Sequence, residues 1–124
     1  MESQPKKVLV VENDEVIIVL ISHVLTRHSY VVHSTFDALE AERMLDGDDY
    51  DAILLDLKMP NGGIELIRKI ERRNPALLRK VIVVTGAIHE TAQLTGIPLN
   101  AVVRKPFEIE NLIATVSACV NSPS

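Results

Sequence analysis

Short apolar runs alternate along this chain with longer segments in which apolar residues recur every three or four positions. The runs are rich in Val, Ile and Leu, and they predict β-strands at 8–11, 30–33, 52–55, 81–85 and 101–103. The segments between and after them predict helices at about 16–28, 36–45, 64–74, 88–94 and 109–120. Nearly continuous apolar strands that alternate with helices indicate a parallel sheet covered on both faces.

The predicted fold class is therefore α/β, a three-layer, doubly wound sheet of five parallel strands. Periodicity does not specify the order of the strands. Right-handed crossovers and the size of the chain leave few topologies, of which the flavodoxin-like order 2-1-3-4-5 is the commonest compact one. At 124 residues the chain has room for one domain, 1–124, with a core from about 6 to 120.

Composition and charge narrow the classes of partner. Hydrophobic residues make up 47% of the chain and charged residues 24%, a globular mixture. A formal net charge of -4 argues against direct nucleic acid binding by this domain. We expect a cytoplasmic protein that does not bind membranes, because the longest apolar stretch is too short for a span and Met1 to Lys7 lacks a signal-peptide core. The single Cys119 lies in an apolar helical stripe and is expected in the core.

Polar residues end four of the five predicted strands. Asp56 follows the apolar run 52–55, and Glu12, Asn13 and Asp14 follow the first strand. The fourth strand ends at Thr85 and the fifth leads to Lys105. In the order 2-1-3-4-5 these strand ends meet at the carboxyl edge of the sheet, where open α/β sheets bind ligands.

This set of residue types has a definite chemistry. Clustered carboxylates repel one another, and a hard divalent cation with oxygen ligands, magnesium by preference, relieves that repulsion. Lys105 supplies a positive charge and Thr85 a hydroxyl, which together can hold a phosphoryl group. Two alternatives stay open: Asp56 as a cap of the next turn, and Glu12, Asn13 and Asp14 as caps of the first helix.

The strand-end motifs E-N-D, L-L-D-L-K-M-P, V-V-T-G and R-K-P-F occur in this order over essentially the whole chain. In this combination the chain resembles the receiver domain of two-component response regulators, including the chemotaxis regulators. The resemblance implies that Asp56 accepts a phosphoryl group from a histidine kinase or a phosphotransfer protein in a magnesium-dependent reaction. It also implies a phosphorelay switch that loses its phosphoryl group slowly and is not a turnover enzyme.

The resemblance assigns further roles residue by residue. Magnesium would be held by Glu12, Asn13, Asp56 and the backbone carbonyl of Lys58, with Asp14 as a further candidate. Lys105 and Thr85 would bond the phosphoryl oxygens, and Gly86 and Ala87 would belong to the loop that switches. The peptide bond between Lys105 and Pro106 would be cis and would aim the lysine into the pocket.

Two positions depart from the family pattern. Asn13 stands where a second acid is usual, so we expect magnesium to bind weakly. Val102 stands where an aromatic switch residue is common, so the loop 86–89 and the helix after it would have to carry the signal by displacement. These departures support an alternative function, a pseudo-receiver that binds proteins without being phosphorylated. A phosphohydrolase would want an acid two residues after Asp56, where Lys58 stands.

The expected partners follow from the same resemblance. They are a histidine kinase or phosphotransfer protein and a downstream effector or output domain. Homodimers formed through the fourth helix, the fifth strand and the fifth helix are a habit of the family. The apolar residues expected to be exposed for such a contact are Ile88, Leu94 and Leu99.

Overall fold

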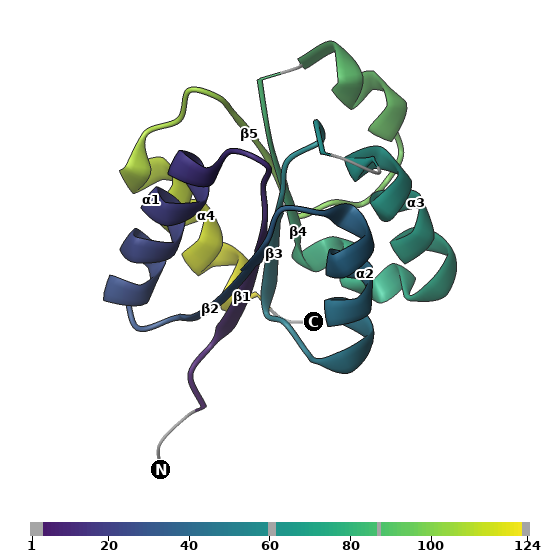
Figure 1. Ribbon diagram of the computed structural model, residues 1–124. Coiled ribbons are helices and arrows are strands. Elements are labelled where there is room, and N and C mark those ends of the chain that lie inside the picture. The colour runs from purple at the N-terminus through teal and green to yellow at the C-terminus, as the bar shows by residue number, and fades with distance from the viewer. Residues whose placement is uncertain (1–3, 60–61, 87, 123–124) are drawn as a thin grey trace.

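The computed structural model describes residues 4–59, 62–86 and 88–122, which form five strands, four α-helices and two 3-10 helices. Figure 1 shows their arrangement. The elements in chain order are β1 (Lys7–Val11), α1 (Glu15–Arg27), β2 (Val31–Thr35), α2 (Ala38–Gly47), β3 (Ala52–Leu55), α3 (Gly63–Arg73), η1 (Pro75–Lys80), β4 (Val81–Thr85), η2 (Ile88–Leu94), β5 (Ala101–Arg104) and α4 (Ile109–Val120). None of the helices in the described ranges has the length and apolar character needed to cross a membrane.

All four strand pairs are parallel, and the strand order is β2-β1-β3-β4-β5. Helices α1 and α4 cover one face of the sheet, and α2 and α3 cover the other (Figure 1). The predicted fold class, the three layers and the order 2-1-3-4-5 are confirmed.

The central strand β3 shows how the sheet holds the two cores together. Its four residues are all buried. Because side chains alternate along a strand, Ile53 and Leu55 enter the core beside α2 and α3, whereas Ala52 and Leu54 enter the core beside α1 and α4. This two-sided burial explains the continuous apolar run in the sequence.

Two of the helices differ in detail from their predicted form. The Asp37 carboxylate accepts a hydrogen bond from the backbone N–H of Leu39, so α2 begins at Ala38 rather than at the predicted Phe36. In the described part of the segment between β4 and β5, the structure has one 3-10 helix, η2 at Ile88–Leu94. Its bounds agree with the predicted short helix, although its winding is tighter.

The expected pattern of exposed apolar residues was partly wrong. Leu94 is buried, and Leu99 is partly buried against the core beside α3; the side chain of Ile88 lies outside what the structure describes. Among the described residues, three of the seven exposed large apolar side chains lie on α1, namely Val16, Val19 and Leu20. The apolar residues of this helix are therefore only partly used in the core.

Candidate functional site

Asp56 lies directly after β3, at the carboxyl edge of the sheet. Its backbone N–H donates to the carbonyl of Val11 on the neighbouring strand at 2.9 Å. Its Oδ1 accepts a hydrogen bond from the backbone N–H of Lys58 at 3.1 Å. The residue is only 5% exposed, so the sheet and the following turn hold this carboxylate in one place.

Glu12 occupies the matching position after β1 and is 2% exposed. Its backbone N–H donates to the carbonyl of Thr35 at 3.2 Å. Its Oε2 accepts from the backbone N–H of Asp14 at 3.0 Å, which fixes the side chain against the start of α1. The predicted meeting of the ends of β1 and β3 is thus observed.

Lys105 joins the two acids. Its Nζ donates to Glu12 Oε1 at 2.6 Å and to Asp56 Oδ2 at 3.1 Å. Its backbone N–H donates to the carbonyl of Thr85 at 2.9 Å, which continues the pairing of β5 with β4. The peptide bond to Pro106 is cis, as predicted. One ammonium group therefore bridges two buried carboxylates that follow separate strands.

The electrostatics of this cluster follow from burial and proximity. Burial raises the pKa of Glu12; the hydrogen bonds from Lys105 and from the Asp14 N–H oppose this shift, and the neighbouring Asp56 adds to it. Burial alone would lower the pKa of Lys105. The hydrogen bonds and charges of Glu12 and Asp56 outweigh that effect, so the pKa of Lys105 is raised and its ammonium stays charged at neutral pH.

Thr85 ends β4 next to this cluster and is fully buried. Gly86 follows it, and a Cβ at Gly86 would lie 3.7 Å from the Cβ of Lys105, an ordinary contact distance. The structure thus brings the ends of β1, β3, β4 and β5 to one edge, as the sequence predicts. Ala87 lies outside the described residues.

The two remaining residues of the E-N-D motif differ from each other. Asp14 Oδ1 accepts from the backbone N–H groups of Val16 at 3.0 Å and Ile17 at 3.4 Å, so its carboxylate caps α1. The capping alternative is therefore observed for Asp14. Asn13 is exposed beside it.

Gly63 at the start of α3 is a residue of the site that the strand-end pattern does not identify. A Cβ at this position would lie 2.5 Å from the Asp56 carbonyl oxygen and 2.8 Å from the Cα of Leu57. Only glycine allows the start of α3 to approach the backbone around Asp56 so closely. The pair Gly62-Gly63 after the D-L-K-M-P motif was the available signal, but it does not reveal which backbone is approached.

The donor atoms at this edge fit a magnesium ion. Within the described ranges no three His, Cys, Asp or Glu side chains form a group that could hold a metal. Magnesium, however, commonly uses one or two protein carboxylates and keeps several waters. Glu12 and Asp56 supply two carboxylates that share Lys105 as their counter-ion, which meets that requirement.

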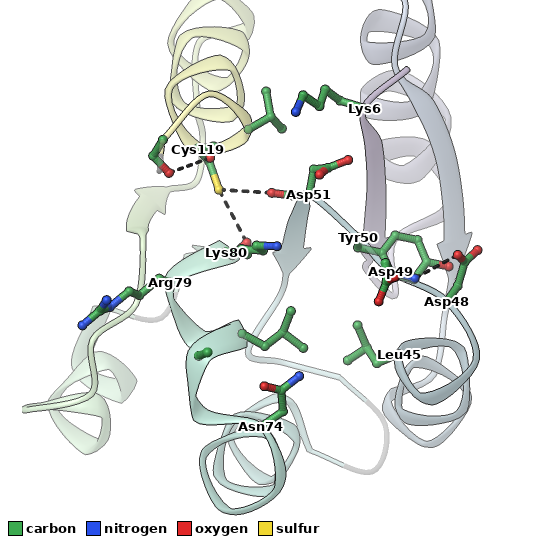
Figure 2. A pocket seen from close by; sticks show the side chains of 14 residues that line it. Lys6, Leu45, Asp48, Asp49, Tyr50, Asp51, Asn74, Arg79, Lys80 and Cys119 are labelled. Carbon is green, nitrogen blue, oxygen red and sulfur yellow. Dashed lines mark hydrogen bonds between the residues drawn. The ribbon is translucent and has the colours of Figure 1, made fainter. Parts of the chain in front are cut away.

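A pocket of about 450 Å³ lies at the opposite edge of the sheet (Figure 2). The Sγ of Cys119 donates there to the carbonyls of Asp51 at 3.8 Å and Lys80 at 3.7 Å. Asp51 precedes β3 and Asp56 follows it, so the length of the strand, about 13 Å, separates the two edges. This pocket therefore takes no part in chemistry at Asp56.

The fold and the site define a class of protein: a flavodoxin-like α/β domain with two buried acids and a lysine at its carboxyl edge. The chain belongs to the response regulator receiver domain family, whose family model matches residues 8–117. Receiver domains are modules of two-component signalling rather than turnover enzymes, and they work with histidine kinases and output domains.

Individual relatives agree with this assignment. The chain is 29% identical over 115 residues to the transcriptional regulatory protein TcrA of Mycobacterium tuberculosis, covering 90% of this chain and 45% of TcrA. It thus spans less than half the length of that relative.

Solved structures show the same fold. A CheY-like receiver domain from Methanospirillum hungatei JF-1 is 23% identical, with a TM-score of 0.86 and 95% of each chain covered. The receiver domain of the sensor histidine kinase PA1611 from Pseudomonas aeruginosa PAO1 is 24% identical, with a TM-score of 0.85, and covers 96% of this chain and 100% of that one. The PA1611 structure has a magnesium ion coordinated in its active-site cleft.

Proposed function

We propose that this chain is a phosphoacceptor receiver domain that takes a phosphoryl group onto Asp56. The observation that carries the proposal is the position of Lys105 Nζ, 3.1 Å from the buried Asp56 carboxylate and 2.6 Å from Glu12. A lysine held against a buried nucleophilic carboxylate is suited to bind the charged oxygens of an incoming phosphoryl group.

In the proposed reaction an Asp56 carboxylate oxygen attacks the phosphorus of a phosphohistidine on the donor protein. A P–O bond forms, the P–N bond breaks, and the imidazole leaves with the electron pair and takes up a proton. Such a transfer needs mainly alignment and neutralisation of charge. The hydrogen bond from the Lys58 N–H aligns the Asp56 carboxylate, and Lys105 supplies the charge.

Magnesium is the proposed cofactor, and Glu12 and Asp56 are the side chains that would hold it, with Asn13 and the Lys58 carbonyl as further ligands. When bound, the metal would neutralise charge on the phosphoryl oxygens. The magnesium ion in the PA1611 receiver domain supports this assignment. We expect weak binding, because Asn13 is uncharged and Asp14 is committed to the α1 cap.

The proposed switch starts at Thr85 and at the loop that begins with Gly86. A phosphoryl group adds about -1.5 to -2 units of charge, which Thr85 and Lys105 would compensate by moving toward it. Val102 on β5 has no ring and is 46% exposed. The displacement is therefore proposed to pass through the loop and η2 to a downstream effector or output domain.

Intact-mass spectrometry after incubation with a small phosphodonor and magnesium tests the proposal. We expect the wild-type chain to gain one phosphoryl group and the Asp56→Asn chain to gain none. A matched control is Asp51→Asn, which changes the acid at the other end of β3. An unmodified wild-type chain, also in the presence of a phosphorylated histidine phosphotransfer protein, would instead favour the pseudo-receiver alternative that Asn13 and Val102 suggest.

A further inference from the structure

Helix α1 carries an apolar stripe on the side that faces away from the sheet. Val16, Val19 and Leu20 are 75%, 62% and 43% exposed. Their spacing places them on one face of the helix. The opposite face is used in the core, where α1 buries Ile18, Ile21 and Leu25. In Figure 1, α1 forms the outer left border of the molecule.

A surface hollow coincides with this stripe, and its lining consists of Glu15, Val16, Val19, Leu20 and His23. A large aliphatic side chain left in water forgoes the stabilisation that burial would give it. Adjacent exposed apolar residues of this kind mark interaction surfaces more often than isolated ones do.

The charges around the stripe are ordered. Asp14 and Glu15 lie at its N-terminal end, and His23 and Arg27 lie at its C-terminal end. The helix macrodipole favours acids at the start and bases at the end of any helix, but it does not explain three exposed aliphatic residues between them. An acidic end, an apolar centre and a basic end together make a surface that is complementary to itself when inverted.

We propose that this stripe is an interface between two copies of the chain, in which the two α1 helices pack antiparallel about a two-fold axis at Val19. Val19 then meets the Val19 of the second copy, with Val16 and Leu20 on either side. Glu15 lies opposite the second copy's His23, whose imidazole N–H donates to the carboxylate. Each contact occurs twice, as two-fold symmetry requires.

The size of the stripe sets the strength of this dimer. Helix α1 has 13 residues and is therefore about 20 Å long. A single pair of such helices buries less than the roughly 1,200–2,000 Å² of a stable interface. We therefore expect a dissociation constant on the order of 100 μM. Because Asp56 is not part of the interface, this inference does not depend on the proposed function.

Sedimentation equilibrium of the full chain, from about 10 to about 500 μM, tests the interface. The wild-type chain is expected to show a concentration-dependent monomer–dimer equilibrium. Val19→Glu brings two carboxylates together at the axis and should weaken the dimer at least about tenfold. Leu39→Glu, the same kind of change at an exposed position on α2, should leave the dimer unchanged. Circular dichroism checks that both variants are folded.

A charge exchange adds specificity to the test. Glu15→Lys alone and His23→Glu alone should each weaken the dimer, and the double variant should restore it. A chain that stays monomeric at all concentrations, or a dimer that is insensitive to Val19→Glu, overturns the proposal. The proposal is also overturned if the wild-type chain remains monomeric and Val19→Glu weakens only the binding of a different protein. The stripe would then be a surface for that protein and not for a second copy of the chain.

Discussion

At the scale of single residues, Lys105 has two roles. It holds two buried acids, Glu12 and Asp56, against a single positive charge, and it places an ammonium group beside the candidate nucleophile. A buried pair of charges contributes little net stability when complete, but it is costly when one partner is removed. Stability measurements on Lys105 variants therefore report on the site even without a phosphodonor.

Lys105→Met should lower the free energy of unfolding at pH 7 by about 2 kcal/mol, because two carboxylates then face each other without a counter-ion. Burial and the neighbouring Asp56 raise the pKa of Glu12, and Lys105 no longer opposes this shift in the variant, so the deficit should shrink as the pH falls and this carboxyl takes up a proton. Urea denaturation at pH 7 and pH 5 measures both effects. The exposed-residue control Lys58→Met should cost far less; an equal loss in the two variants contradicts the assigned role of Lys105.

Asn13→Asp should tighten magnesium binding, because it adds a negative charge next to Glu12 and Asp56. At about 4 Å and an effective dielectric constant of about 20, one added charge is worth several kcal/mol of gross attraction to a dication before desolvation. Calorimetric titration gives the dissociation constant directly. No gain in affinity would show that Asn13 lies outside the metal's coordination sphere.

Gly63→Ala should lower the free energy of unfolding by about 1–3 kcal/mol or more, because its Cβ would collide with the backbone at Asp56 and Leu57. Gly47→Ala is the matched control, since a Cβ there meets nothing within 4 Å and alanine favours the helix. Denaturation curves of the two variants should therefore shift in opposite directions. A Gly63→Ala chain as stable as the wild type contradicts the close approach.

The residues that end strands could be predicted, because parallel strands bring their carboxyl ends to one edge whatever the details of packing. Asp56, Thr85 and Lys105 were identified in this way, and Lys105 does contact Asp56. The steric role of Gly63 could not be predicted, because it depends on which backbone segment α3 approaches. That is a property of tertiary packing.

At the scale of elements, α1 connects the site to the surface. Its first turn is capped by Asp14, its inner face fills the core, and its outer face is apolar and exposed. The helix itself was predicted from its period. Its outward face was not, because apolar residues on all sides of a helix hide which side meets the sheet.

Asp14→Ala should destabilise the chain by about 1 kcal/mol through loss of the α1 cap. The same variant should still be phosphorylated, because the Asp14 carboxylate bonds the helix N-terminus rather than the Asp56 cluster. Thermal unfolding and intact-mass analysis are the two measurements. Loss of phosphorylation with unchanged stability would instead make Asp14 a metal ligand.

At the scale of the whole molecule, stability at alkaline pH depends in part on Cys119, at the edge of the sheet opposite Asp56. Burial raises the pKa of this thiol above its ordinary value of 9.0. A raised pKa in the folded state means that the stabilising contribution is complete below the unfolded pKa and is lost as the pH rises toward the folded pKa.

The free energy of unfolding should therefore fall over the alkaline interval above about pH 8, with a slope of up to about 1.4 kcal/mol per pH unit from this thiol. Cys119→Ala should show a shallower decline over the same interval, whatever its stability at pH 8. The contribution of Lys105 to the free energy of unfolding is lost only at higher pH, because its pKa is raised from 10.5. Equal slopes for the two chains would rule out Cys119 as the titrating group.

The burial of β3 on both faces has a further consequence for signalling. The strand that presents Asp56 is anchored simultaneously in two cores, so it cannot slide or tilt without disturbing both. We therefore expect β3 to stay rigid, so that a conformational change starting at Asp56 passes through the loops that border this edge of the sheet.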